Sequence, residues 1–261
     1  MLSSLSAQDR ALLQANTWRA RKLAEWVASI DDLARIQDLL ADILEANAEI
    51  LATSDPSHTE SNLVGEESEA PRAEVGPKLK VGLFVGHSQG TGATAIDGED
   101  EWESRNKLAT LAAELLQSRG YFVYVIQRNP NVGYAAAMRE HGETSKRLDL
   151  DLAIELHFNA FNGEAHGAEI LVASTSTLET LGAAFIAATK AAYPDRVLRG
   201  GGAKLNRGGR GSLFNRHQPC PSGIYEPCFG DSPEWREYSS DPNKEARYLA
   251  DIVERFNKWT G

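Results

Sequence analysis

Four residues whose side chains suit metal binding or proton transfer stand at the ends of predicted strands or at the start of a predicted helix. His87 and His157 follow short apolar runs, Glu226 ends another, and Glu101 opens a strongly periodic segment. Two imidazoles and a carboxylate suit Zn²⁺, whose catalytic sites commonly use three protein ligands and leave a fourth position open. A further carboxylate is then needed to accept a proton from water, a role that Glu226 can take.

The residue types alone leave a second interpretation open. A histidine at the end of a strand is often a hydrogen-bonded structural residue rather than a metal ligand. Whether these four side chains can meet depends on the elements that carry them.

Short apolar segments alternate with helical segments from residue 79 onward. Strands are predicted at 80–87, 121–128, 150–158, 168–174 and 223–226, and helices at 101–119, 134–147, 177–192 and 243–259. This alternation favours an α/β fold with a mostly parallel twisted sheet flanked by helices. Functional groups in such a sheet gather at the carboxyl ends of the strands, so we expect all four residues in one crevice.

The composition and charge of the chain exclude two classes of protein. The net charge is −10, from 27 basic and 37 acidic residues, and a nucleic-acid-binding protein would need a basic face instead. No apolar run is long enough for a transmembrane segment. The first residues place Asp9 and Arg10 where a secretory signal would be apolar, so we expect synthesis in the cytoplasm without a signal peptide.

Four segments carry most of the chemistry-bearing residues: VGLFVGHSQGTGA (81–93), EWESRNKLATLAAELLQSRGYFVYVIQR (101–128), LDLAIELHFNAFNGEAHGAEIL (150–171) and PSGIYEPCF (221–229). In order and spacing they resemble the zinc-dependent N-acetylmuramoyl-L-alanine amidases of the AmiC and CwlV type, the Amidase_3 family. The resemblance covers nearly all of residues 79–261 and none of the first 78. The most specific match is Leu-His-x-Asn-Ala at residues 156–160.

Other family features align with single residues of this chain. The Gly-His pair that ends the first strand is Gly86-His87, and the glutamate that opens the following helix is Glu101. The terminal Glu-x-x-Phe begins at Glu226. Ser88 and the pair Pro227-Cys228 depart from the usual small residues, but neither change removes a ligand. Asp100 and Glu103 lie close enough in sequence to be alternatives to Glu101.

The resemblance implies hydrolysis of the amide between the lactyl group of N-acetylmuramic acid and L-alanine of the peptidoglycan stem peptide. It implies Zn²⁺ held by His87, Glu101 and His157, with Glu226 accepting the proton of the attacking water. It also implies a catalytic domain that spans residues 79–261.

Substrate contacts are predicted beside the metal site. Asn159 follows the second histidine and could bind substrate, although asparagine after a strand also serves turns. The segment 199–211 predicts a flexible basic loop, with Lys204, Arg207 and Arg210 suited to the carboxylates of a peptide. A solvated surface loop is the alternative.

The predictions for the remaining histidines and for the cysteines are less specific. We expect His141 in a helix and His166 and His217 in loops, each structural or exposed. Cys220 and Cys228 are read as buried small residues, with a disulfide as the alternative.

The first 78 residues differ from the rest of the chain. Residues 6–52 contain no glycine or proline, and apolar side chains recur at three- and four-residue steps between residues 33 and 50. This predicts a helical hairpin module over 1–52, with self-association through 33–50 as the leading role. Packing on the main domain and binding to the wall or a partner are alternatives. Residues 53–78 are rich in Ser, Glu, Pro and Gly and predict a disordered linker.

Three functions follow for the whole protein. The leading hypothesis is a phage-type lysin that reaches peptidoglycan, in the host periplasm or cell wall, after release from the cytoplasm. The second is a zinc peptidase that cleaves within the stem peptide. The third is a wall-binding protein with an inactive amidase fold.

Overall fold

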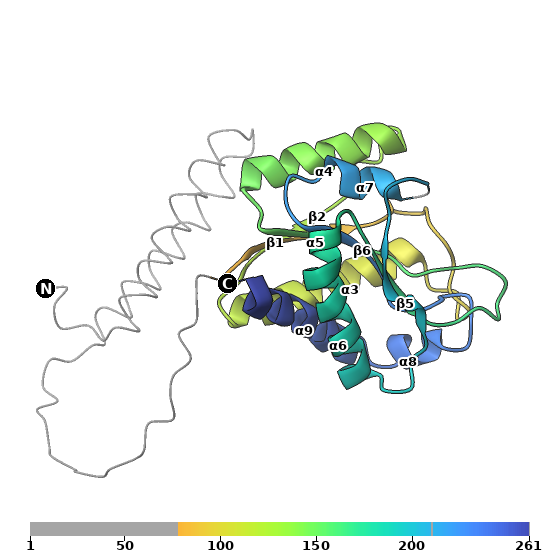
Figure 1. Cartoon of the computed structure of the whole chain (residues 1–261). Coiled ribbons are helices and arrows are strands. Elements are labelled where there is room, and N and C mark those ends of the chain that lie inside the picture. The colour runs from red at the N-terminus through yellow and green to blue at the C-terminus, as the bar shows by residue number, and fades with distance from the viewer. Residues whose placement is uncertain (1–77, 210, 261) are drawn as a thin grey trace, which may run out of the picture. The chain divides into compact units, whose positions relative to one another are not determined.

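The computed structural model describes residues 78–209 and 211–260, which form one α/β unit (Figure 1). The predicted helical module 1–52 and all of the predicted linker 53–78 except Lys78 lie outside the described residues. The described residues contain a six-stranded sheet with the order β2-β1-β3-β6-β4-β5. Its strands are β1 (Lys80–Val85), β2 (Phe122–Ile126), β3 (Leu152–Leu156), β4 (Ala168–Val172), β5 (Leu198–Leu205) and β6 (Ser222–Glu226).

The sheet is mostly parallel, as predicted. The pairs β1–β2, β1–β3, β3–β6 and β4–β5 run parallel, and only β4–β6 is antiparallel among the pairs described. Each parallel pair requires a crossover connection, and helices provide most of these. Because β1, β3 and β6 are adjacent and parallel, their carboxyl ends lie together at one edge of the sheet.

Helices cover both faces of the sheet (Figure 1). They are α3 (Glu101–Ser118), α4 (Tyr134–Leu148), α5 (Thr175–Thr177), the π-helix η2 (Leu178–Gly182), α6 (Ala183–Ala192), α7 (Ser212–His217), α8 (Trp235–Ser239) and α9 (Pro242–Thr260). Helices α3, α6 and α9 pack on one face around a large apolar cluster that includes Leu108, Ile154 and Leu249. Helices α4 and α7 cover the other face around Phe84 and Phe214. None of the described helices is long and apolar enough to cross a membrane.

The prediction of a flexible loop over residues 199–211 was wrong for the first half of this segment. Residues 198–205 form β5, which pairs with β4 from Ala168↔Leu198 to Val172↔Leu205. The glycines that suggested a loop make a bulge inside this strand, since Gly200, Gly201 and Gly202 all have positive φ angles. Glycine adopts that conformation without strain, so the strand bends and then resumes its pairing.

Two short helices were not predicted. Helix α7 follows the basic segment and ends at His217, so this histidine lies in a helix and not in the expected loop. Helix α8 lies in the segment between β6 and α9. At five and six residues, both are too short to show a helical period in sequence.

Candidate metal centre and active site

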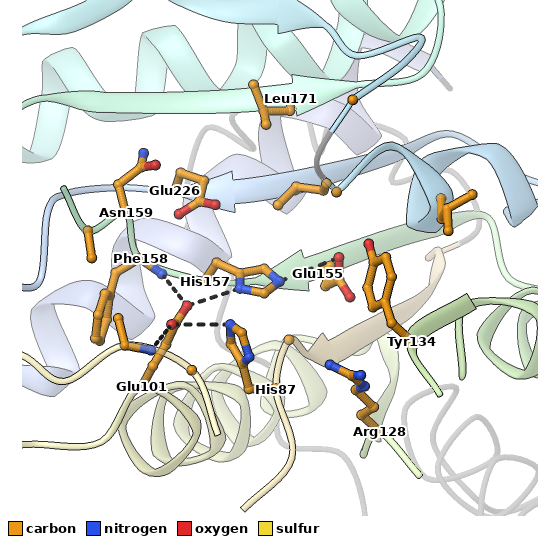
Figure 2. A pocket seen from close by; sticks show the side chains of 18 residues that line it. His87, Glu101, Arg128, Tyr134, Glu155, His157, Phe158, Asn159, Leu171 and Glu226 are labelled. Atoms are coloured by element: carbon orange, nitrogen blue, oxygen red, sulfur yellow. Dashed lines mark hydrogen bonds and ion pairs between the residues drawn. The ribbon is translucent and has the colours of Figure 1, made fainter. Parts of the chain in front are cut away.

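Three neighbouring strands deliver the predicted functional residues to one edge of the sheet. His87 follows β1, His157 follows β3, and Glu226 is the last residue of β6. Glu101 is the first residue of α3, whose N-cap Asp100 accepts a hydrogen bond from the backbone N–H of Glu103. Figure 2 shows the four side chains around a common space.

The side chains of His87, Glu101 and His157 offer one ligand atom each within 4.8 Å of one another. Nε2 of His87 lies 3.2 Å from Oε2 of Glu101, and Nδ1 of His157 lies 3.0 Å from Oε1. A tetrahedral Zn²⁺ site, with metal–ligand distances near 2.0–2.1 Å, separates its ligand atoms by about 3.3 Å. The three side chains therefore fit a single divalent metal ion without rearrangement of the backbone.

The carboxylate of Glu101 has four polar partners. In addition to the two imidazoles, the backbone N–H groups of Ala93 and Phe158 donate to its oxygens at 2.9 and 3.2 Å. Burial raises the pKa of Glu101, but the hydrogen bonds and charges of His157 and His87 outweigh it, so its pKa lies well below its usual value. Neither Asp100 nor Glu103, the sequence alternatives, belongs to the ligand cluster.

His157 lies between two carboxylates. Its Nδ1 faces Glu101, and its Nε2 lies 3.5 Å from Oε2 of the buried Glu155 on β3 (Figure 2). Burial lowers the pKa of His157, but hydrogen bonding to Glu101 and Glu155 raises it well above 6.5 overall. A carboxylate behind a ligating histidine fixes which nitrogen carries the proton and turns the other toward the metal.

Two glycines leave room for the imidazoles. A Cβ atom on Gly86 would lie 2.2 Å from Cε1 of His157, and one on Gly92 would lie 2.9 Å from Cγ of His87. Gly92 also has a φ of 109°, which favours glycine. Gly86 and Gly92 are thus required by the packing of the ligands.

Glu226 is half-buried beside the ligand cluster, and its buried Oε2 atom has no hydrogen-bond partner among the described residues. Burial is the main cause that raises the pKa of Glu226 to about 8; the charge of His157 opposes it, and nearby Glu101, Glu169 and Glu155 add to it. A carboxyl group with such a pKa exchanges a proton near neutral pH, as a general base must.

The four residues line a pocket of about 740 Å³. Its walls combine polar groups with Phe158, Leu171, Leu213 and Ile224. The pocket is large enough for a peptide-bearing sugar residue to reach the ligand cluster.

The family model for N-acetylmuramoyl-L-alanine amidase, Amidase_3, matches residues 81–257. The chain belongs to this family. The predicted membership of the Amidase_3 family is thereby confirmed over almost the whole described unit.

Several solved structures have a similar fold. The catalytic domain of the CD27L endolysin targeting Clostridia difficile is 26% identical, with a TM-score of 0.54 over 67% of this chain and 97% of that chain. AmiC2 of Nostoc punctiforme is 17% identical, with a TM-score of 0.56 over 69% and 97%. Cwp6 from Clostridium difficile is 18% identical, with a TM-score of 0.57. The aligned region covers 70% of this chain but only 30% of Cwp6. Among curated proteins no match was found.

Not all of the predicted substrate-binding residues line the pocket. Asn159 lines it, and its Nδ2 donates to Oε1 of Glu169 at 3.2 Å. Lys204 lies in β5, where its ammonium group pairs with the other oxygen of Glu169. Arg207 is exposed and near Thr175, and Arg210 lies outside the described residues.

Glu169 and Glu226 are direct cross-strand partners on β4 and β6. Lys204 and Arg199 both form ion pairs with Glu169, so they compensate a negative charge next to Glu226. This contact explains why Lys204 faces the strand and does not extend from a loop.

Three lining residues were missed by sequence reasoning: Arg128, Tyr134 and Glu155. Arg128 follows β2, Tyr134 opens α4, and Glu155 precedes the Leu-His pair. Their positions after a strand, at a helix start and inside a strand were visible in sequence, but no local signal separated them from ordinary structural residues.

The other histidines and the cysteines agree in part with expectation. His141 is buried in α4 against the ring of Phe84, and His166 is exposed. Cys228 is buried and Cys220 half-buried, and both are free thiols, so no disulfide joins them.

Proposed function

We propose that the chain is a zinc-dependent peptidoglycan hydrolase that cleaves the amide between N-acetylmuramic acid and L-alanine. The observation that carries this proposal is the convergence of His87, Glu101 and His157 with the half-buried Glu226 in one pocket. Family membership supplies the substrate class.

The donor set favours Zn²⁺ over Mg²⁺ and Ca²⁺. Two imidazole nitrogens and one carboxylate oxygen form a three-ligand set typical of catalytic zinc, whereas Mg²⁺ and Ca²⁺ prefer oxygen donors. When bound, Zn²⁺ polarises the substrate carbonyl and lowers the pKa of a water molecule.

The residues of the chain perform the proton transfers. Glu226 takes the proton from the attacking water and returns it to the nitrogen of L-alanine as the amide bond breaks. Its partial burial suits this exchange, because the pKa of about 8 in the metal-free protein falls when a cation is held beside it. The apolar walls of the pocket limit access of other water molecules.

Glu155 and the two backbone donors act on the ligands and not on the substrate. Glu155 orients His157 through Nε2, and the N–H groups of Ala93 and Phe158 donate hydrogen bonds that position the carboxylate of Glu101. Asn159 extends from the strand end into the pocket and is proposed to contact substrate.

The biological setting is proposed to be that of a phage lysin acting on peptidoglycan after release. The likeness to the CD27L endolysin catalytic domain supports this setting. Self-association through residues 33–50 stays a prediction, as do roles for Lys204, Arg207 and Arg210 in substrate binding.

A metal-reconstitution experiment tests the proposal. Purified protein is treated with a chelator, reloaded with one equivalent of Zn²⁺, and assayed for solubilisation of purified sacculi. We expect chelation to abolish solubilisation and Zn²⁺ to restore it. Glu226→Gln should bind Zn²⁺ with unchanged stoichiometry yet lose at least about a hundredfold in rate.

The matched control is Glu103→Gln, because Glu103 is an exposed acid two residues from Glu101. This variant should retain both metal and activity. Unchanged solubilisation by Glu226→Gln, together with absence of zinc binding by the wild type, would favour the wall-binding alternative.

A further inference from the structure

Arg128 differs from the other arginines that the fold withdraws from solvent. Of the described arginines that are buried or half-buried, four form ion pairs with carboxylates: Arg105 with Glu245, Arg196 with Glu234, Arg199 with Glu169 and Arg255 with Asp251. Arg128 is half-buried too, but no described carboxylate pairs with it. Its Nε is buried and has no hydrogen-bond partner within the described part of the chain.

The guanidinium group of Arg128 belongs to the pocket. Arg128 is the one Lys or Arg among the described lining residues, and its Cζ lies 5.2 Å from the ring centroid of Tyr134. The tyrosine ring supports a cation but leaves the edges of the guanidinium available for hydrogen bonding. An unpaired cation that is partly removed from water is costly unless a ligand supplies the opposite charge.

The acids that line the pocket do not supply this charge. Glu101 faces both ligand histidines, and Glu155 faces Nε2 of His157. Glu226 lies across the pocket, because Figure 2 shows Glu226 and Asn159 on one side of the histidines and Arg128 and Tyr134 on the other. A substrate whose reacting amide lies at the ligand cluster has a muramoyl side and a stem-peptide side. One of these two sides therefore extends toward Arg128.

The chemistry of the substrate decides which direction that is. The lactyl carboxyl group of N-acetylmuramic acid is consumed in the amide, so the muramoyl side carries no free carboxylate. The stem peptide does, first at its second residue, where D-glutamate is linked through its γ-carboxyl group, and, where the stem ends as a tripeptide, also at its third residue. Planar guanidinium groups bind carboxylates through two parallel hydrogen bonds.

We propose that Arg128, supported by Tyr134, forms a subsite that binds a free carboxylate of the stem peptide on the leaving-group side of the reacting amide. This inference rests on the proposed amidase function. It implies that the enzyme distinguishes stem peptides with a free α-carboxylate from those in which that group is a carboxamide.

The test compares muramoyl tripeptides that end in L-lysine amide and differ only at the second residue, D-glutamate or D-isoglutamine. A second pair has D-isoglutamine throughout and differs in whether the third residue carries a free carboxylate or a carboxamide. The D-isoglutamine tripeptide amide belongs to both pairs, so zinc-loaded wild type, Arg128→Gln, Arg128→Lys and the control Arg139→Gln are assayed on three substrates. Arg139 is an exposed residue of α4 that does not line the pocket.

We expect the wild type and Arg139→Gln to prefer the carboxylate form of one pair by about tenfold or more in kcat/KM, the size of one charge-assisted hydrogen bond. Arg128→Gln should lose the preference and cleave both members at the slower rate. Arg128→Lys should keep part of it, because it keeps the charge but not the planar fork. The pair that shows the preference identifies the residue that carries the carboxylate.

Calorimetric binding of the corresponding free peptides to the same proteins separates the subsite from catalysis. If the wild type cleaves none of the substrates but binds carboxylate peptides more tightly through Arg128, the amidase function fails and the subsite stands. If the wild type cleaves and binds both members of each pair equally, or if Arg128→Gln keeps the preference, the subsite is refuted while the amidase function stands.

Discussion

His157 is the residue on which the proposed metal centre depends most, because both of its ring nitrogens face carboxylates. Glu101 takes one nitrogen at 3.0 Å and Glu155 faces the other at 3.5 Å. Glu155 is 1% exposed, and its Oε1 has no partner among the described residues. Burying a carboxylate with an unpaired oxygen costs free energy. The orientation of His157 by Glu155 explains why the fold keeps a carboxylate at this position.

Replacing Glu155 should weaken metal binding without weakening the fold. Glu155→Leu removes the acceptor behind His157, and the affinity for Zn²⁺ should fall about ten- to a hundredfold, measured by competition with a chromogenic chelator. Glu155→Gln keeps an acceptor oxygen and should retain most of the affinity. A Glu155→Leu protein that loses metal-free stability but keeps its zinc affinity would show that Glu155 is only structural.

Metal binding should release protons at neutral pH. Because the pKa of His157 is raised well above 6.5, the metal-free protein carries a proton on this residue that a metal ligand cannot keep. The apparent affinity for Zn²⁺ should therefore rise with pH up to the pKa of His157. Calorimetry in buffers of different ionisation enthalpy measures the proton count, and zero protons released near pH 7 would contradict this assignment.

Sequence patterns could predict the residues that stand at strand ends and helix starts. His87, His157 and Glu226 each follow an apolar run, and Glu101 opens a periodic helix, so their meeting follows from the sheet topology. Arg128 and Glu155 could not be assigned in this way. The role of Arg128 depends on the absence of a carboxylate partner among the described residues, and the role of Glu155 depends on the orientation of the His157 ring. Both are properties of the packed structure.

At the scale of elements, a buried ion pair joins α3 to α9 beneath the site. Arg105, one turn after Glu101, donates from Nη1 and Nη2 to the carboxylate of Glu245 at 2.6 and 3.1 Å. Its guanidinium also lies 5.7 Å from the ring of Phe158, the residue after His157. The helix that begins with a ligand is thus fixed to the C-terminal helix and to the loop that carries another ligand.

Breaking this pair on one side should be strongly destabilising. Arg105→Met leaves the Glu245 carboxylate buried without its cation, and urea unfolding should show a loss of about 3–5 kcal/mol. The double variant Arg105→Met/Glu245→Leu removes the orphaned charge and should recover most of that loss. Equal stabilities of the single and double variants would indicate that Glu245 does not depend on Arg105.

Elements with a long period or a clear apolar run were predictable, and short ones were not. The predicted helices at 101–119 and 243–259 correspond to α3 and α9, because each has several turns with one apolar face. Strand β5 was missed, since its glycine bulge resembles a loop in sequence and its pairing with β4 is decided by the sheet. Helices α7 and α8 are too short to carry a period.

At the scale of the whole described unit, a cluster of buried tyrosines sets the response to alkali. The rings of Tyr193, Tyr225, Tyr238 and Tyr248 contact one another between α6, α8, α9 and the sheet. Burial raises the pKa of each hydroxyl above its usual value of 10.0.

The fold should therefore lose stability as the pH rises above about 10. Tyrosines of the unfolded chain ionise there while the folded ones stay neutral, so the unfolded state binds fewer protons and is favoured. The stabilising contribution is complete below about pH 10 and is lost above it. Urea titrations of the metal-free protein at about pH 8 and pH 11 measure the loss, which Tyr248→Phe should reduce. A free energy of unfolding that does not change between these values would contradict the prediction.

The proposed amidase activity is tested most directly by finding which bond the protein cleaves in whole sacculi. Purified sacculi are digested with the zinc-loaded full chain, and the soluble and insoluble products are analysed by mass spectrometry. We expect stem peptides with a free amino group on L-alanine and glycan chains whose muramic acid carries a free lactyl carboxyl group. Products cut within the stem peptide, with L-alanine still attached to muramic acid, would contradict this expectation and show a peptidase instead.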